Sequence, residues 1–107
     1  MWAMAALPGG RLACGDFNSG LVRVINAATG ACEAELLGHA SGIRSVLLLP
    51  DGRLATGSDD KTIRMWDLAS KACVAVLEGH ITTVCALTVY RGQLVSGSAD
   101  GQITVWA

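Results

Sequence analysis

Residues 55–67 read ATGSDDKTIRMWD, and residues 95–107 read VSGSADGQITVWA. The two stretches share a Gly-Ser pair, an Asp shortly after it, and a Trp near their end. They begin 40 residues apart in a chain of 107 residues, which is long enough for one small domain. Similarity at this distance is typical of architectures built from repeated units, so the repeat guides the interpretation of the whole sequence.

A unit of about 41 residues recurs around these stretches. The Gly-His pair at 38–39 returns at 79–80, a shift of 41, and Trp66 returns as Trp106, a shift of 40. The missing residue falls in a turn, because VLLLPDGRL in the middle copy becomes the shorter LTVYRGQL in the last. A weaker copy, LPGGRLACGDFNSGLVRVIN, precedes both. The three copies cover about residues 1–36, 37–77 and 78–107 of a single domain.

Each copy consists of short apolar runs separated by turn residues. In the middle copy the segment 50–52 is Pro-Asp-Gly, which favours a turn because Pro fixes φ and Gly accepts a positive φ. The pattern leaves no room for helices and predicts an all-β chain of eleven strands, with four in each of the first two copies and three in the last. The strands expected in the middle copy are 43–49, 53–58, 62–67 and 72–77.

The first strand of the middle copy is almost continuously apolar, most clearly from Val46 to Leu49. Such a run indicates burial on both faces of the sheet. A small sheet is covered on both faces when similar sheets flank it, and four-stranded sheets stacked radially form a β-propeller. We therefore predict three blades of antiparallel strands, the last without its fourth strand.

The order of motifs resembles the WD-repeat β-propeller family: Gly-His, then Ser/Thr-Gly-Ser-x-Asp, then a strand that ends in Trp-Asp. The last copy departs from it by ending in Trp106-Ala107. The resemblance is strong over 37–106 and weak over 1–36, and it implies that each good blade is held by four buried, hydrogen-bonded side chains. The sets implied are His39, Thr56, Asp60 and Trp66, and His80, Ser96, Asp100 and Trp106.

The chemistry of such a tetrad is coherent. An indole N–H can only donate, so a buried Trp needs an acceptor. The hydroxyl can accept from the Trp and donate to the His, whose other ring nitrogen can donate to the carboxylate. The same residue types make up a hydrolase triad. A nucleophile needs exposure and an oxyanion hole, however, whereas these hydroxyls are expected beneath a Trp. We therefore predict no catalytic residue and regard a hydrolase as the weakest alternative.

The first copy departs from the tetrad pattern. Cys14 occupies the hydroxyl position, Ile25 the Trp position, and Asn18 is the nearest substitute for the Asp. No Gly-His pair precedes them, so packing alone is expected to hold this blade. The four cysteines of the chain form no C-x-x-C pair. We expect them to be reduced and buried rather than bridged or bound to metal.

The composition narrows the range of partners. Charged residues make up 16% of the chain, the net charge is −1, and the basic residues are scattered, which argues against nucleic acid. The longest apolar stretch, residues 1–7, is too short to cross a membrane, and the opening MWAMAALPGG has no basic segment typical of a signal peptide. We expect an intracellular protein without a membrane partner, a metal or a cofactor.

The resemblance implies a non-enzymatic scaffold whose rim binds a protein or peptide that the sequence does not identify. In the family, contact positions cluster where the first strand of each blade begins and just before the tetrad Asp. The rim residues implied by position are Trp2, Phe17, Gly42, Arg44, Asp59, Thr83, Cys85 and Ala99.

Three blades are too few for a ring, because propellers close with about four to eight. Both ends of the chain carry apolar residues where repeat proteins are usually capped by polar ones. We therefore expect self-association into a homo-oligomer, in which two copies give six blades or three give nine. Two alternatives stay open: the chain is an excerpt of a longer propeller, or it is a fragment with no independent function.

Overall fold

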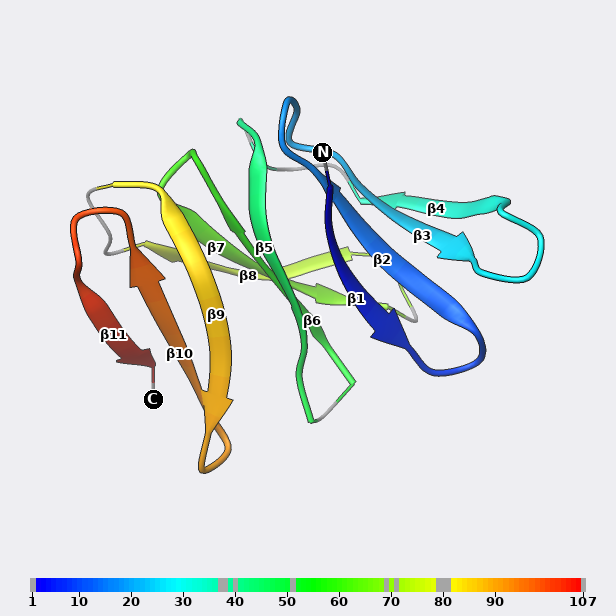
Figure 1. Ribbon diagram of the computed structural model, residues 1–107. Helices are drawn as coiled ribbons and strands as arrows, with labels where there is room; N and C mark the ends of the chain where they lie inside the picture. Colours follow the sequence, from blue (N-terminus) through cyan, green and yellow to red (C-terminus); the bar gives the residue numbers. More distant parts are fainter. Residues whose placement is uncertain are drawn as a thin grey trace.

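The fold is taken from a computed structural model, which describes residues 2–36, 39, 41–50, 52–68, 70, 72–78 and 82–106. Within these residues eleven strands form three antiparallel sheets of four, four and three strands (Figure 1), which confirms the predicted all-β class. The first sheet contains β1 (Trp2–Leu7), β2 (Arg11–Asp16), β3 (Val22–Asn26) and β4 (Cys32–Leu36). The second contains β5 (Ile43–Leu48), β6 (Leu54–Ser58), β7 (Thr62–Asp67) and β8 (Ala72–Glu78). The third contains β9 (Val84–Tyr90), β10 (Gln93–Ser98) and β11 (Ile103–Trp106).

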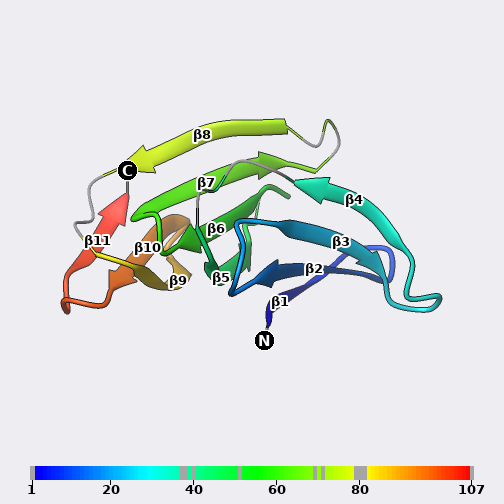
Figure 2. The same ribbon diagram turned by 90° about the horizontal axis from the view of Figure 1, so that it is seen from above.

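The three sheets stand side by side in an arc (Figure 2). Each sheet runs in chain order from its first strand to its last. The first strands β1, β5 and β9 lie next to one another along one edge of the arc, and β4, β8 and β11 lie toward the opposite edge. Each sheet is therefore one blade, and the blades are numbered 1, 2 and 3 in chain order.

The turns between the first two strands of each blade explain the change in repeat length. Gly10, Gly52 and Gly92 occupy equivalent turn positions and all have positive φ, between 75° and 91°. In blade 3 the turn is only two residues long, and Arg91 also has a positive φ of 52°. Positive φ at both central residues characterises the tightest hairpin turns, so blade 3 connects its strands with a shorter loop.

The core is divided between the two spaces that separate the blades. Between blades 1 and 2, Ala13, Val22 and Leu36 pack against Leu54 and Trp66. The equivalent space between blades 2 and 3 is filled by buried residues from both sheets: Leu49, Ala55, Ile63, Met65, Val84 and Leu94. Blade 2 thus contributes one face to each cluster.

The burial of blade 2 differs from the expectation in one respect. The run from Val46 to Leu48 in β5 is half-buried, and only Leu49 beyond it is buried. It is the second strand, β6, that is buried at every residue from Leu54 to Ser58. The reason is position: β6 lies between β5 and β7 and between two neighbouring sheets, whereas β5 lies at the edge of the arc.

Candidate functional site

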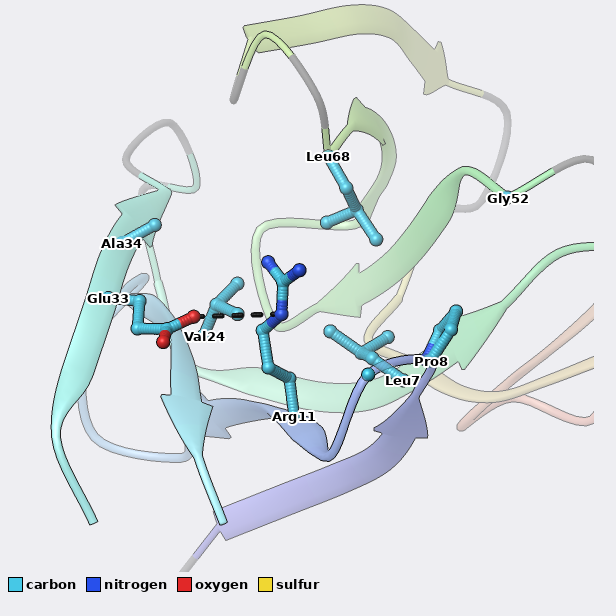
Figure 3. Close-up of a pocket in the computed structure, with 9 residues that line it drawn as sticks. Leu7, Pro8, Arg11, Val24, Glu33, Ala34, Gly52 and Leu68 are labelled. Atoms are coloured by element: carbon cyan, nitrogen blue, oxygen red, sulfur yellow. Dashed lines mark ion pairs between the residues drawn. The ribbon is translucent and has the colours of Figure 1, made fainter. Parts of the chain in front are cut away.

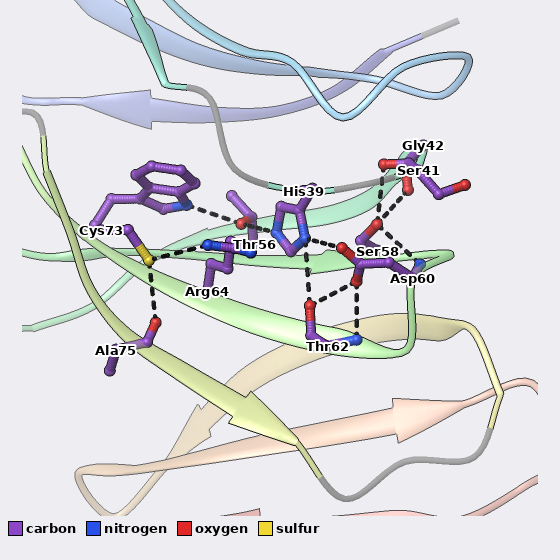
Figure 4. A network of polar contacts seen from close by, with 11 residues as sticks. His39, Ser41, Gly42, Thr56, Ser58, Asp60, Thr62, Arg64, Cys73 and Ala75 are labelled. Atoms are coloured by element: carbon purple, nitrogen blue, oxygen red, sulfur yellow. Dashed lines mark hydrogen bonds and ion pairs between the residues drawn. The ribbon is translucent and has the colours of Figure 1, made fainter.

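The four residues implied for blade 2 lie together in one hydrogen-bonded chain (Figure 4). Trp66 Nε1 donates to Thr56 Oγ1 over 2.9 Å, and Thr56 Oγ1 lies 2.6 Å from His39 Nε2. The other ring nitrogen, His39 Nδ1, lies 2.8 Å from Asp60 Oδ2. Two antiparallel strands position the central pair, because Thr56 on β6 and Trp66 on β7 are brought close by the register that aligns Leu54 with Trp66.

The donors and acceptors of this tetrad are consistent with a single tautomer of His39. Because the indole can only donate, Thr56 Oγ1 accepts a hydrogen bond from Trp66, and its O–H donates one to His39 Nε2. His39 Nδ1 then carries the hydrogen and donates to Asp60. The second oxygen of Asp60 accepts from the backbone N–H of Thr62 at 2.9 Å and from its hydroxyl at 2.6 Å. Every polar group in the chain of contacts is satisfied, which favours a rigid network.

The blade 2 tetrad has the connectivity of a catalytic triad but lacks a reactive surface. The side chain of His39 is fully enclosed, and Thr56 is 0% exposed beneath Trp66. Burial lowers the pKa of His39 below its usual value, and the hydrogen bond to Asp60 offsets this effect only in part. A substrate carbonyl has no access to a hydroxyl enclosed in this way, so the geometry favours a structural role over nucleophilic catalysis.

A neighbouring hydroxyl, which the sequence analysis did not single out, extends the network. Ser58 Oγ donates to the carbonyl of Gly42 over 2.9 Å and accepts from the backbone N–H of Asp60 at 3.1 Å. It thereby connects the turn after β6 to the segment before β5. The recurrence of Gly-Ser at 57–58 and 97–98 was the signal that could have identified it.

Blade 3 contains part of the equivalent arrangement. Trp106 Nε1 donates to Ser96 Oγ over 2.8 Å, as Trp66 does to Thr56. Asp100 accepts a short hydrogen bond from Ser98 and one from the backbone of Gln102, and these contacts lower its pKa. His80, the fourth residue implied for this blade, lies outside the described residues. Trp106 is only half-buried, unlike Trp66.

In blade 1 the turn carboxylate is Asp16 rather than a side chain at Asn18. Asp16 accepts from the backbone N–H of Asn18 at 2.9 Å and from the hydroxyl of Ser19 at 3.1 Å. Cys14 is half-buried, and burial and the nearby Cys32 raise the pKa of its thiol. All four cysteines of the chain are free, but the expected burial is wrong: Cys14 and Cys73 are half-buried, and Cys32 and Cys85 are exposed. No group of three or more His, Cys, Asp or Glu side chains in the described part of the chain could hold a metal ion.

Several of the implied rim residues lie together, near the start of β5 and in the turn that follows β6. Arg44 donates to both carboxylate oxygens of Asp59, at 2.8 and 3.0 Å, and its guanidinium lies 5.2 Å from the ring centroid of Phe17. Hydrogen bonds from Arg44 lower the pKa of Asp59, with a smaller contribution from Thr83. Residues of all three blades are thus connected here, and the two charges satisfy each other rather than pointing freely to solvent.

The remaining rim residues belong to the same turns. Gly42 accepts from the backbone N–H of Asp59 at 2.9 Å, and Thr83 accepts from that of Ala99 at 3.0 Å in the equivalent position of blade 3. Cys85 is exposed, and Trp2 is the first residue of β1.

Two grooves of similar size lie at equivalent places between the blades. The groove between blades 1 and 2 has a volume of about 450 Å³ and is lined by Leu7, Val24 and Leu68 among others (Figure 3). Arg11 lies within it, with Nε 3.6 Å from the carboxylate of Glu33. A second groove, of about 420 Å³, lies between blades 2 and 3. The repeated Leu-Pro turn recurs in both, so the grooves follow from the way one blade meets the next. The second groove includes Leu49, Pro50, Met65, Leu94 and Trp106.

The outer surfaces of blades 1 and 3 are largely apolar and uncovered. Because side chains alternate across a strand, the neighbours of buried residues point away from blade 2. We call these surfaces the blade 1 end face and the blade 3 end face. The blade 1 end face consists of Met4, Ala6, Leu12, Cys14 and Ile25. The blade 3 end face consists of Ala86, Thr88, Val95, Gly97, Ile103 and Val105.

The comparison with protein families agrees with these features. The model of the WD domain, G-beta repeat, matches residues 30–67 and 71–107. The chain belongs to the WD40 repeat family. Proteins of this family are usually non-enzymatic, and the WD40 membership confirms the resemblance inferred from the sequence. In the described residues no helix is long and apolar enough to span a membrane.

The relatives of this WD40 chain are much longer than it is. It is 42% identical over 104 residues to the WD repeat-containing protein pop2 of Schizosaccharomyces pombe, a match that covers 82% of this chain and 15% of pop2. It is 33% identical over 93 residues to the probable coatomer subunit beta' of the same species, covering 81% and 12%. The ribosome biogenesis protein YTM1 of Kluyveromyces lactis is 28% identical over 101 residues, covering 82% and 22%.

Solved structures confirm the propeller architecture. The WD40 beta propeller domain of Doa1 superposes with a TM-score of 0.89 at 22% identity, over 97% of this chain and 35% of that one. The computationally designed Ika4 protein superposes with a TM-score of 0.81 at 28% identity, over 97% of this chain and 63% of Ika4. The three sheets of this chain thus match the blades of WD40 propellers.

Proposed function

We propose that this chain is a non-enzymatic scaffold for protein–protein interactions, and that it completes a propeller ring by associating with further copies of itself. WD40 membership supports the scaffold, because WD40 repeats are typical interaction modules. The proposed contacts with a protein or peptide partner are the rim residues, of which Arg44, Asp59 and Phe17 form the most structured part. Intracellular location is part of the same proposal.

The exposure of apolar residues on the two end faces is the observation that supports the proposed self-association. On the blade 3 end face Ile103 is 75% exposed and Val105 is 58% exposed, whereas their counterparts Ile63 and Met65 in blade 2 are 0% and 8% exposed. On the blade 1 end face Met4 is 62% exposed. Burying a large apolar side chain contributes about 1.5–3 kcal/mol, so covering both faces strongly favours association.

The mass of the particle in solution tests this proposal. Light scattering after gel filtration, over a range of protein concentrations, should give two or three times the chain mass of 11.0 kDa. A monomer at all concentrations would contradict self-association. It would instead support the alternative that the next blades belong to a longer chain, which the greater length of the relatives favours.

The absence of catalysis has its own test. Hydrolysis of an activated ester by the purified chain should not exceed the rate in buffer. If hydrolysis were detected, and if it were lost in a Ser96→Ala variant that still folds, the buried hydroxyl would have to be accessible and the non-enzymatic proposal would be wrong.

A further inference from the structure

We infer that the ring closes head to tail, with the blade 3 end face of one copy receiving the blade 1 end face of another copy in the register that joins blades within the chain. The seat of this contact, meaning the second-strand glycine against which the first residue of the next blade packs, is Gly97. The inference rests on the proposed self-association and names the surfaces and the orientation that it uses.

Within the chain, each contact between blades passes over a glycine in the second strand. A Cβ atom placed on Gly15 of β2 would overlap the side chain of Ile43 at the start of β5. A Cβ atom on Gly57 of β6 would lie 2.7 Å from Val84 Cγ1 at the start of β9. At both junctions the first residue of the next blade sits directly against the glycine, and only a hydrogen leaves enough room.

Gly97 occupies the same position in β10, but no further blade lies over it. A Cβ atom placed there would meet only Ala86, its neighbour in the same sheet, at 3.9 Å. The positions around it are apolar in the same pattern as in the covered blades: Val95 corresponds to Ala55, and Ile103 to Ile63. Blade 3 therefore retains an empty seat of the kind that is filled twice within the chain.

Blade 1 carries the complementary surface. Trp2 stands at the start of β1, paired with Asp16, as Ile43 is paired with Ser58 and Val84 with Ser98. The residues behind it correspond to those with which blade 2 covers blade 1: Met4, Ala6, Leu12 and Ile25 stand in place of Val46, Leu48, Leu54 and Trp66.

The charged residues Arg23 and Glu35, which share this side of blade 1, do not prevent the contact. Arg23 of β3 forms an ion pair with Glu35 at 3.4 Å. Its counterpart in blade 2, Arg64, lies half-buried on the face that covers blade 1. An arginine at this position is therefore compatible with a neighbouring blade.

A head-to-tail contact is favoured over the pairing of identical faces. If two blade 3 end faces met, both seats at Gly97 would face each other and both blade 1 end faces would stay exposed. In the head-to-tail arrangement every copy covers both of its end faces, and rotation closes the ring. The same contact is used at every junction.

A pair of glycine variants tests the seat. Gly97→Val should preserve the strand content of the chain, because its Cβ position is open, and should reduce the particle mass to 11.0 kDa. Gly57→Val should fail to fold, because the same seat is filled within the chain by Val84. If Gly97→Val keeps the mass of the wild type, the inferred register is wrong even though self-association stands. If the wild type itself is a monomer, the proposed function fails first.

A second pair of variants keeps the test informative if Gly97→Val does not fold. Ile103→Glu places a charge on the blade 3 end face, whereas Val74→Glu places the same charge on β8, which is also exposed but lies outside both end faces. We expect Ile103→Glu to be a monomer and Val74→Glu to keep the wild-type mass. The reverse result would overturn the inference.

The reactivity of the Cys14 thiol tests whether the blade 1 end face is covered. Cys14 belongs to the blade 1 end face and should be shielded in the ring, whereas Cys85 at the rim is exposed in either state. Labelling with a maleimide, followed by peptide mass mapping, should show Cys14 reacting at least tenfold faster relative to Cys85 in Ile103→Glu than in the wild type. Equal ratios in the two proteins would show that this face is not covered.

Discussion

Replacing Thr56 by valine tests the tetrad most directly. Valine has nearly the same shape, so the change removes the hydroxyl and leaves the packing of β6 intact. The hydroxyl has two partners, Trp66 Nε1 at 2.9 Å and His39 Nε2 at 2.6 Å. Neither partner can turn to water, because Trp66 is 1% exposed and the side chain of His39 is enclosed.

The expected loss follows from these two orphaned groups. A buried polar group left without a partner costs about 1–3 kcal/mol, so the two together should lower the free energy of unfolding by roughly 2–6 kcal/mol. That is a large part of the stability of about 5–15 kcal/mol that is typical of small domains. For a chain of this size the melting temperature should fall by about 10 °C or more.

Urea unfolding followed by tryptophan fluorescence, at one fixed protein concentration, measures the loss. Thr104→Val is the matched control, because Thr104 is a half-buried residue of β11 whose hydroxyl has no hydrogen bond to the described residues. Its unfolding free energy should change by less than about 0.5 kcal/mol. If Thr56→Val is no less stable than Thr104→Val, the hydrogen bonds of the tetrad do not hold blade 2 and the reasoning is refuted.

Three further predictions concern pH, packing and the rim. The pKa of His39 is lowered in the folded chain, so its contribution to stability is complete above about pH 6.5 and decreases as the pH falls toward the folded pKa. Urea midpoints measured across this pH range should show the decrease in the wild type. A decrease of the same size in His39→Gln would contradict the prediction. Gly15→Ala forces a methyl group against Ile43 and should cost about 1–3 kcal/mol in thermal unfolding, with no loss falsifying the close approach. Arg44→Gln breaks an exposed ion pair with Asp59 and should leave the melting temperature nearly unchanged, whereas a large drop would mean that the rim contacts hold the blades together.

Much of the fold could be predicted from the sequence because the decisive signals are local and repeated. The turn around Gly52, with its positive φ, and the spacing between Thr56, Asp60 and Trp66 recur at nearly constant intervals. A buried indole, imidazole and carboxylate must each find a partner, and the register between two adjacent strands brings those partners together. The tetrad of blade 2 was implied by the family resemblance, which itself rests on residue types at fixed distances along the chain.

Other features depend on how one sheet meets the next, and no spacing in the sequence encodes them. The sequence suggested that Arg44 and Asp59 are available to a partner, but the structure pairs them with each other across the turns of blade 2. The close approach of the next blade to Gly15 and Gly57 exists only where two sheets pack together, and no local pattern in the sequence marks it.

The sequence by itself determined that this chain builds repeated blades of short antiparallel strands, because turn residues and apolar runs act locally. The resemblance that it carries implied the tetrad of Trp66, Thr56, His39 and Asp60 in blade 2. The tertiary structure alone decided which surfaces are covered and which are left open. Burial depends on the distance and angle between whole sheets, so the same apolar residue type is fully buried at Ile63 and exposed at Ile103.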